Sequence, residues 1–284
     1  MRIEKKDHSL NDALRQYMVM VETSKGAASK TFLAYDSRLG HLRKWAADHK
    51  IITIRQFGPQ QAGSFSGEIA SRLAPKTANE IIKLATAFFS WCEDVFELDG
   101  IRPFRSVKRP KVSRTMKSFW TVPQIDAILS VAPSVEFKAF WALMAFAGLR
   151  YSEALNLAWE NVQEGKISLV GKGNKIASIP ISKKLSTILD SLKSKRKGRI
   201  FGGDFPQRND DSIVVLKIAV AKSGIKSDGS IDHHRFRHSF ASNLIRSGVN
   251  IKAVQQLMRH ESIAITLNTY SHLLPTDLAD AVEL

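Results

Sequence analysis

Apolar residues recur at helical spacing through the first hundred residues. A first segment begins at Ser9, which can cap it. The apolar positions of the next segment, at spacings of three and four, are Thr31, Tyr35, Leu39, Leu42 and Trp45. Such spacing predicts one face of a helix, here ending near His49. Thr53 precedes a shorter segment, and residues 77–98 repeat the pattern. We therefore expect a helical bundle over roughly residues 8–98.

The pattern changes after this bundle. Residues 99–119 contain Asp-Gly and two Arg-Pro pairs, which are strong linker signals. Thr121 and Gln124 have capping-box spacing and open a new unit, in which a strongly apolar helix ends at Gly148. Residues 166–181 are rich in β-formers around Gly-Lys-Gly-Asn, which predicts a hairpin. The predicted fold class is mainly α with a small β-sheet.

We expect three parts: a helical domain over residues 1–98, a basic interdomain linker over 99–119, and a mainly α domain with a β-hairpin over 120–284. The chain has 42 Lys and Arg against 27 Asp and Glu, a formal net charge of +15. This excess favours a polyanionic partner, either nucleic acid or an acidic membrane surface. A basic surface that only aids solubility is the alternative.

The linker concentrates this charge. It holds seven cations and no acid between positions 102 and 117, and they are Arg102, Arg105, Lys108, Arg109, Lys111, Arg114 and Lys117. A solvated tether is the simplest interpretation of a charged run. Because neighbouring like charges repel one another unless an anion lies alongside, we favour a strap that lies on DNA phosphates.

Cysteine usage and hydropathy indicate the compartment. The single cysteine, Cys92, excludes an intramolecular disulfide and fits a reducing environment. The first 12 residues are polar and show no export signal. The longest apolar run, residues 141–149, is far shorter than the ~20 residues of a membrane span. We expect a cytoplasmic protein with no membrane segment.

The densest group of candidate functional residues is HHRFRHSF, residues 233–240. Asp232 or Ser230 can cap a helix through this stretch that ends at Gly248. The polar residues at positions i, i+3 and i+4 share one face of that helix, and they are His234, Arg237 and His238. Such a face offers hydrogen-bond donors to an anion. A surface helix with salt bridges is the alternative.

More polar groups lie on either side of this helix in the sequence. A helix that starts at Asn250 delivers His260 at its end, and Tyr270 follows ten residues later. Upstream, Arg150 follows a helix-ending glycine, and Glu153, in the next helix, can brace an arginine or a histidine. A lone Tyr or His is more often a packing or surface residue. These residues therefore indicate a functional site only when they are taken together.

This set resembles the tyrosine recombinases, the family of phage integrases and chromosome-dimer resolvases. The resemblance rests on Gly-Leu-Arg-x-Ser-Glu, Gly-Lys-Gly-Asn-Lys, His-x-x-Arg-His, a later His and a Tyr near the end, in order, over residues 118–284. The front half, through TFLAYDSRLGHLRKW, resembles the family's helical core-DNA-binding domain. The compact, two-domain type is implied. One departure is Arg259, where the family often has Gly.

The resemblance implies a reaction in which a tyrosine attacks a DNA phosphate and leaves a 3′-phosphotyrosine, with no metal and no cofactor. By position, the implied catalytic residues are the nucleophile Tyr270 with Arg150, Lys172, His234, Arg237 and His260. The implied supporting residues are Glu153 and His238. Arginines suit the phosphate oxygens. Lys172 is the implied general acid, and the neighbouring Lys175 is the residue most easily mistaken for it. Which histidine accepts the phenol proton is left open.

The implied partner is double-stranded DNA with a specific recombination site, held by a homotetramer that joins two duplexes. Phage integration, transposon cointegrate resolution and chromosome dimer resolution all use these parts. The compact build favours a simple two-site resolvase. The alternatives are a type IB topoisomerase, which relaxes supercoils without strand exchange, and a non-catalytic DNA-binding protein of the same fold.

Overall fold

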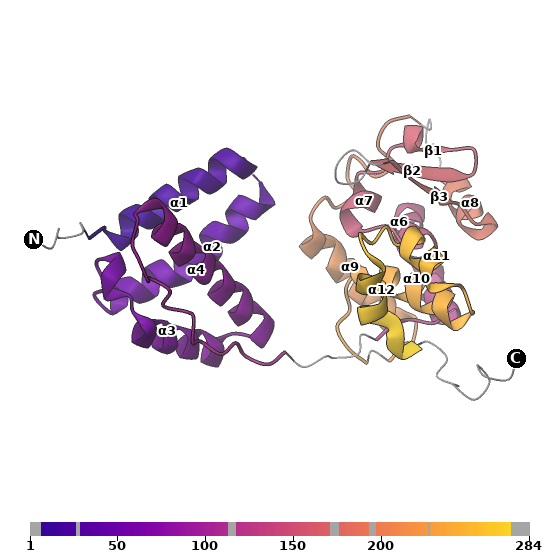
Figure 1. Ribbon diagram of the computed structural model, residues 1–284. Helices are drawn as coiled ribbons and strands as arrows, with labels where there is room; N and C mark the ends of the chain where they lie inside the picture. The colour runs from indigo at the N-terminus through magenta and orange to yellow at the C-terminus, as the bar shows by residue number, and fades with distance from the viewer. Residues whose placement is uncertain are drawn as a thin grey trace, which may run out of the picture. The chain divides into compact units, whose positions relative to one another are not determined.

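The structure, a computed structural model, describes residues 7–26, 29–112, 118–170, 176–192, 197–226 and 228–273. The chain divides into two compact units, Met1–Thr115 and Met116–Leu284. The described elements are helices and one three-stranded antiparallel sheet (Figure 1). This confirms the predicted mainly α fold class with a small sheet.

The first unit is a helical bundle. Its helices are α1 (Leu10–Lys25), α2 (Lys30–Asp48), the short 3-10 helix η1 (Ile54–Gln56), α3 (Pro59–Arg72) and α4 (Pro75–Val95). Ser9 caps α1 as expected, because its Oγ accepts a hydrogen bond from the backbone N–H of Asp12. Aromatic rings fill the core, where Phe57 stacks on Phe89 at a centroid distance of 4.7 Å.

Much of the stretch predicted as a linker lies against this first unit. Phe104 is buried, and its ring centroid is 5.9 Å from that of Phe89. The side-chain amide of Asn79 donates to the Pro110 carbonyl at 2.9 Å. The first part of this stretch therefore packs on the bundle, and the two units divide between Thr115 and Met116.

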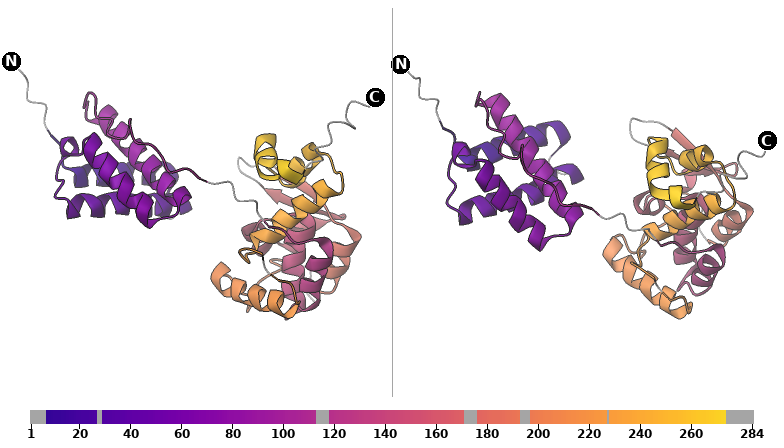
Figure 2. Two further views of the ribbon diagram at one scale, coloured as in Figure 1. Left: turned by 90° about the horizontal axis from the view of Figure 1, so that it is seen from below. Right: turned by 60° about the horizontal axis from the view of Figure 1, so that its bottom comes forward.

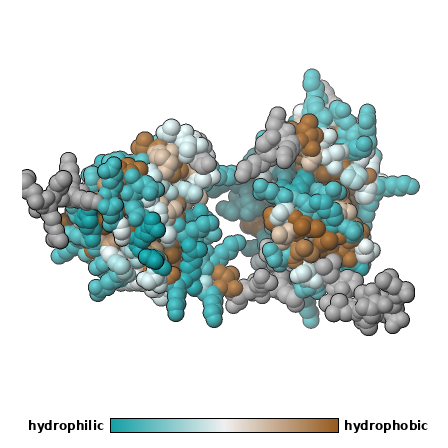
Figure 3. All heavy atoms as spheres, viewed as in Figure 1, coloured by the Kyte–Doolittle hydropathy of each residue, from teal (hydrophilic) through white to brown (hydrophobic). Residues whose placement is uncertain are grey.

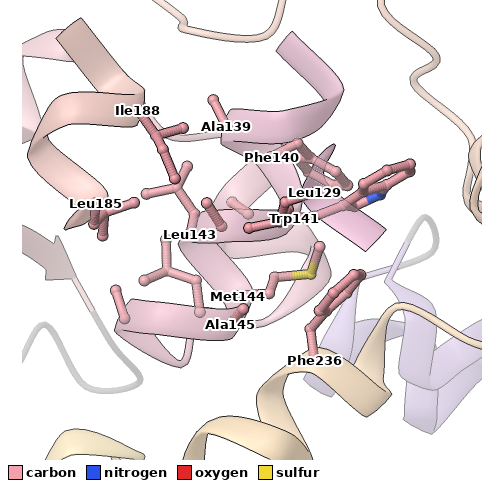
Figure 4. Close-up of a cluster of buried hydrophobic side chains, with 14 of the residues drawn as sticks. Leu129, Ala139, Phe140, Trp141, Leu143, Met144, Ala145, Leu185, Ile188 and Phe236 are labelled. Carbon is pink, nitrogen blue, oxygen red and sulfur yellow. The ribbon is translucent and has the colours of Figure 1, made fainter. Parts of the chain in front are cut away.

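The second unit is built around an apolar central helix. Its helical elements are α5 (Val122–Ser130), α6 (Val135–Ala147), α7 (Tyr151–Leu155), η2 (Trp159–Asn161), α8 (Lys183–Asp190), α9 (Asn209–Lys222), α10 (His234–Arg246), α11 (Ile251–Leu257), α12 (Ile263–Tyr270) and η4 (Ser271–Leu273). Every side chain over residues 139–145 is buried, as expected of a helix covered on all sides. Leu185 and Ile188 from α8 and Phe236 from α10 pack around it (Figure 4).

The sheet of this unit has the order β1-β2-β3, with strands β1 (Val162–Gln163), β2 (Lys166–Val170) and β3 (Ile176–Pro180). The predicted hairpin is confirmed by the antiparallel pairing of β2 and β3. Ile167 pairs with Ile179, and both are buried, so this register places one face of the sheet against the core.

Helix α10 is held on α6 (Figure 2) and on the first described residues of the second unit. The Trp120 backbone N–H donates to the Ser239 hydroxyl at 2.8 Å, and the Asn243 side-chain amide donates to the Trp120 backbone carbonyl at 3.0 Å. The Trp120 ring packs on Phe236 at 4.8 Å. Ser239, Asn243 and Phe236 therefore fix one side of α10 and leave another side for the polar residues.

The face of the molecule in Figure 3 is largely hydrophilic, and apolar side chains gather on it in a few patches. Ile263 and Ile265 on α12 are among the exposed apolar side chains. None of the described helices is long and apolar enough to cross a bilayer.

Candidate active site

The beginning of α10 orients three of the expected residues. The Asp232 carboxylate accepts a hydrogen bond from the Arg235 backbone N–H at 2.9 Å, and the Ser230 hydroxyl donates to that carboxylate at 3.2 Å. Of the two capping residues considered from the sequence, Asp232 makes the contact. One turn of helix then separates His234 from His238, and their rings meet edge to face at 4.8 Å.

Arg237 is the most deeply buried of the expected site residues, with 2% of its surface exposed. Its Nη1 donates to the Gly148 carbonyl and its Nη2 to the Met258 carbonyl. Burial, followed by the charges of Arg150 and Arg259, lowers the pKa of Arg237 to about 9. The guanidinium is therefore still a cation at neutral pH.

Arg150 lies at the turn between α6 and α7. The turn requires glycine at position 148, because its φ is +60° and an added Cβ would lie 2.5 Å from the Phe240 ring. Glu153 holds Arg150 twice: it accepts the backbone N–H at 2.8 Å and Nη1 at 2.6 Å. Burial raises the pKa of Glu153, but the charge of Arg259 and the bonds from Arg150 outweigh it and leave the pKa lowered.

His260 follows α11 and is fixed on two sides. The Gln255 amide donates to the His260 carbonyl at 2.5 Å, and the ring Nδ1 lies 2.9 Å from the Thr266 hydroxyl. Burial, then the charges of Arg237, Arg150, Arg259 and His234, lower the pKa of His260 to about 4. The ring is therefore neutral at pH 7.

Tyr270, the last residue of α12, is 3% exposed and lies against α10. Its hydroxyl is 2.7 Å from His238 Nδ1. Burial raises the pKa of Tyr270, and the charge of Arg237 opposes that rise only in part. The phenol therefore stays protonated at neutral pH unless a neighbour accepts its proton. The sequence indicated His238 as a supporting residue, and the structure places it in direct contact with the expected nucleophile.

The structure thus brings together one set of the expected residues, and they are Arg150, Glu153, His234, Arg237, His238, His260 and Tyr270. Other expected residues lie outside the described part of the chain, and they are Lys172, Arg114 and Lys117. Among the described residues, no group of three or more His, Cys, Asp or Glu could hold a metal ion.

The remaining strap cations belong to the first unit. Arg105, Lys108, Arg109 and Lys111 are exposed. Arg102 has an acidic partner from α4, since its Nε lies 2.8 Å from Glu93. A carboxylate of the bundle therefore neutralises one cation of the strap, which the sequence of the strap alone did not show.

Arg259 is the site residue that sequence reasoning missed. Its guanidinium donates to Glu153 at 2.7 Å and to the Gly148 carbonyl at 3.0 Å. The sequence held one signal of this role, the arginine that replaces the glycine often found before the family's last histidine. That signal shows an unusual residue, but it does not show where a long side chain reaches.

A family model described as the phage integrase family matches residues 119–276. The chain is 31% identical over 196 residues to the tyrosine recombinase XerA of Pyrococcus horikoshii, covering 66% of this chain and 68% of that protein. It is 22% identical over 271 residues to XerD of Shewanella oneidensis, covering 88% of each.

Solved structures show the same fold. A lambda integrase dimer bound to a core site is similar with a TM-score of 0.78, at 17% identity over 93% of this chain and 78% of that one. The XerH recombinase bound to its difH substrate, in a post-cleavage complex, is similar with a TM-score of 0.73, at 16% identity over 95% and 83%.

Proposed function

This chain belongs to the phage integrase family, and from that premise we propose that it is a site-specific recombinase that cuts and rejoins DNA strands through a 3′-phosphotyrosine intermediate. The observation that carries the proposal is the convergence of three distant segments on Arg237. Its guanidinium joins the turn before Arg150 to the end of α11, while Tyr270 lies close enough for the arginine's charge to offset part of the rise that burial causes in the pKa of the phenol.

The arginines supply charge for the transition state. Attack on a phosphodiester concentrates negative charge on its non-bridging oxygens, and fixed donors stabilise that charge without reorganising. A guanidinium has five N–H donors, so Arg237 keeps donors beyond the two that hold carbonyls. Glu153 holds the Arg150 side chain, which is 42% exposed and therefore accessible to a phosphate. Neutral His260 adds one hydrogen-bonding group, and the His234 ring adds another.

The nucleophile requires a base, since a phenol is a weak nucleophile while it is protonated. We assign that role to His238, because its Nδ1 is 2.7 Å from the Tyr270 hydroxyl, within the range for direct proton transfer. The sequence left the choice of histidine open. Lys172 remains the proposed general acid that protonates the departing 5′ oxygen, on the strength of the resemblance alone.

The test starts by footprinting the protein on the DNA that flanks its own gene. A duplex of the protected sequence, nicked next to the cleaved phosphate, should trap a covalent complex that survives denaturation. We expect Tyr270→Phe to lose this complex by more than about 10⁴-fold, because the attacking oxygen is gone. Tyr35→Phe in the first unit is the matched control and should retain it.

Two outcomes would overturn the mechanism. One is a covalent complex that persists in Tyr270→Phe. The other is a complex that a metal chelator abolishes. Relaxation of any plasmid, without a specific sequence, would instead favour a topoisomerase.

For the domains, we propose that residues 1–98 form the core-DNA-binding domain, that 99–119 form the basic strap, and that 120–284 form the catalytic domain. Five exposed strap cations among the described residues support this assignment, and they are Arg102, Arg105, Lys108, Arg109 and Lys111. A homotetramer on two DNA sites is supported by the similar fold of a lambda integrase tetramer bound to a Holliday junction, with a TM-score of 0.74.

For the biological setting, we propose resolution of dimers or cointegrates. The support is coverage: the likeness to XerC of Xylella fastidiosa spans 92% of both chains, whereas the likeness to the integrase of phage 186 spans 61% of that protein. A plasmid with two direct copies of the footprinted site should lose the segment between them. Reaction only with a second, unlike site would favour integration.

A further inference from the structure

Arg259 has a backbone conformation that is unusual for its side chain. Its φ is +53°, in the left-handed region that glycine adopts without strain and residues with a Cβ do not. The neighbouring His260 is one of the proposed catalytic residues. An arginine at this position therefore needs contacts that offset its strain.

The side chain of Arg259 makes such contacts. It is 10% exposed and reaches from the end of α11 to the turn between α6 and α7. There its Nη2 donates to Glu153 Oε2 at 2.7 Å and to the Gly148 carbonyl at 3.0 Å. Its Nη1 donates to the Leu257 carbonyl at 2.8 Å and so secures its own loop.

Both acceptors, one on the turn and one in α7, also serve the proposed phosphate-binding arginines. Glu153 is the carboxylate that holds Arg150, and the Gly148 carbonyl is one of the two that hold Arg237. Arg259 thus shares a partner with each of them, and it is joined through the backbone to His260. No other described side chain bonds to both Glu153 and Gly148.

We propose that Arg259 is a positioning residue: it ties the loop that carries His260 to the turn that carries Arg150, so that the phosphate-binding groups are in register before DNA binds. The inference rests on the proposed recombinase function and deepens it. Arg259 acts through Glu153 and Gly148 and does not itself contact the phosphate.

The charge of Arg259 gives the proposal a second readout. The charged groups around His260 are Arg259 on its own loop, Arg150 on the turn, and Arg237 and His234 on α10. Since Arg259 is one of the cations that lower the pKa of His260, its removal should raise that pKa toward the ordinary value. The acidic limb of the profile of cleavage rate against pH, where the rate falls as His260 takes up a proton, should then move to higher pH.

The test compares Arg259→Gly with Glu164→Gly. Both replace a residue of positive φ with glycine, but Glu164 is an exposed residue in the β1–β2 turn. Wild type must first form the Tyr270-dependent complex on the nicked duplex, and its failure to do so would count against the proposed function instead. Single-turnover cleavage, anisotropy of the same labelled duplex and thermal unfolding are then measured for each variant.

We expect Arg259→Gly to stay folded, to bind DNA within about two-fold of wild type, and to cleave roughly ten- to a hundred-fold more slowly, because misplaced groups lose rate more than affinity. Glu164→Gly should cleave as wild type does. Arg259→Lys keeps the charge but cannot make the branched contacts, so its rate should be intermediate and its pH limb near that of wild type.

Two results would overturn the proposal. Wild-type cleavage with an unshifted pH limb in Arg259→Gly would show that the contacts position nothing. A loss of DNA affinity as large as the loss of rate would make Arg259 a direct DNA contact. If Arg259→Gly fails to fold, the proposal is tested by Arg259→Lys alone. A cleavage rate equal to that of wild type in Arg259→Lys would then refute a positioning role for Arg259.

Discussion

The two units differ in what they bury. In the first unit, the buried side chains that the structure describes are aliphatic or aromatic, together with Ser66 and Cys92. In its ion pairs the arginine stays at least one-third exposed, as in the pair of Arg72 with Glu68. The second unit buries histidine and arginine side chains around α10, and they are His233, Arg235 and Arg237. The unit that we assign to the chemistry is the one that accepts buried charge.

This difference has a physical meaning. Removing a charge from water costs free energy unless hydrogen bonds or opposite charge compensate it. Arg237 is compensated by two carbonyls, while Arg235 pairs with Asp228 and lies over the Trp120 ring at 4.7 Å. Charges fixed in this way do not reorganise during a reaction, which is what stabilisation of a phosphoryl transition state requires.

The largest expected effect comes from Arg237→Met, with Arg105→Met as its counterpart in the first unit. Loss of Arg237 leaves the buried Met258 carbonyl without its donor and the Gly148 carbonyl with Arg259 alone, so it should lower the free energy of unfolding by about 1–3 kcal/mol, with cleavage abolished. Exposed Arg105 should change stability by less than about 0.5 kcal/mol. Calorimetry of the full chain measures both, and equal effects would remove the contrast between the units.

The next effect concerns pH. Burial lowers the pKa of His233 to about 4, whereas an unfolded histidine titrates near 6.5. The folded state therefore binds fewer protons between these values. The contribution of His233 to the free energy of unfolding should be fully present above about pH 6.5. It should fall by roughly 3 kcal/mol as the pH drops to about 4.

His233→Gln should flatten this part of the stability curve, because glutamine does not titrate. Chemical unfolding at a series of pH values measures the slope for both proteins. An unchanged slope in His233→Gln would show that other groups cause the acid sensitivity.

The smallest effect tests the strap of the first unit. Replacing Lys108 and Lys111 with glutamine should reduce the slope of log affinity against log salt by about 0.9 for each DNA phosphate that the strap no longer neutralises. Lys184→Gln is the control, because Lys184 already pairs with Asp126. Equal slopes in the strap variant and wild type would contradict a strap on phosphates.

Most of the fold could be predicted because its signals are local. The apolar spacing of α2, the cap at Ser9 and the glycine stop at Gly148 each act within a few residues. Strand β1 could not be predicted, since two residues show no period. Phe104 also escaped notice, because one apolar residue within a charged run gives no sign that it is buried in the first unit.

The site was predictable in its residues but not in its contacts. His234, Arg237 and His238 share a helix, so their spacing alone places them near one another. The contact between His238 and Tyr270 joins positions 32 residues apart, and no spacing rule covers it. The reach of Arg259 to Glu153 likewise depends on how α11 packs beside the α6–α7 turn.

The most direct test of the central claim, that the charged site of the second unit is assembled for attack by Tyr270, is mass spectrometry of the covalent complex. The complex trapped on the nicked duplex is digested with protease and nuclease, and the linked peptide is sequenced. The account predicts a 3′-phosphoryl nucleotide on Tyr270. A nucleotide linked to another residue, or linked through a 5′ phosphate, would contradict it.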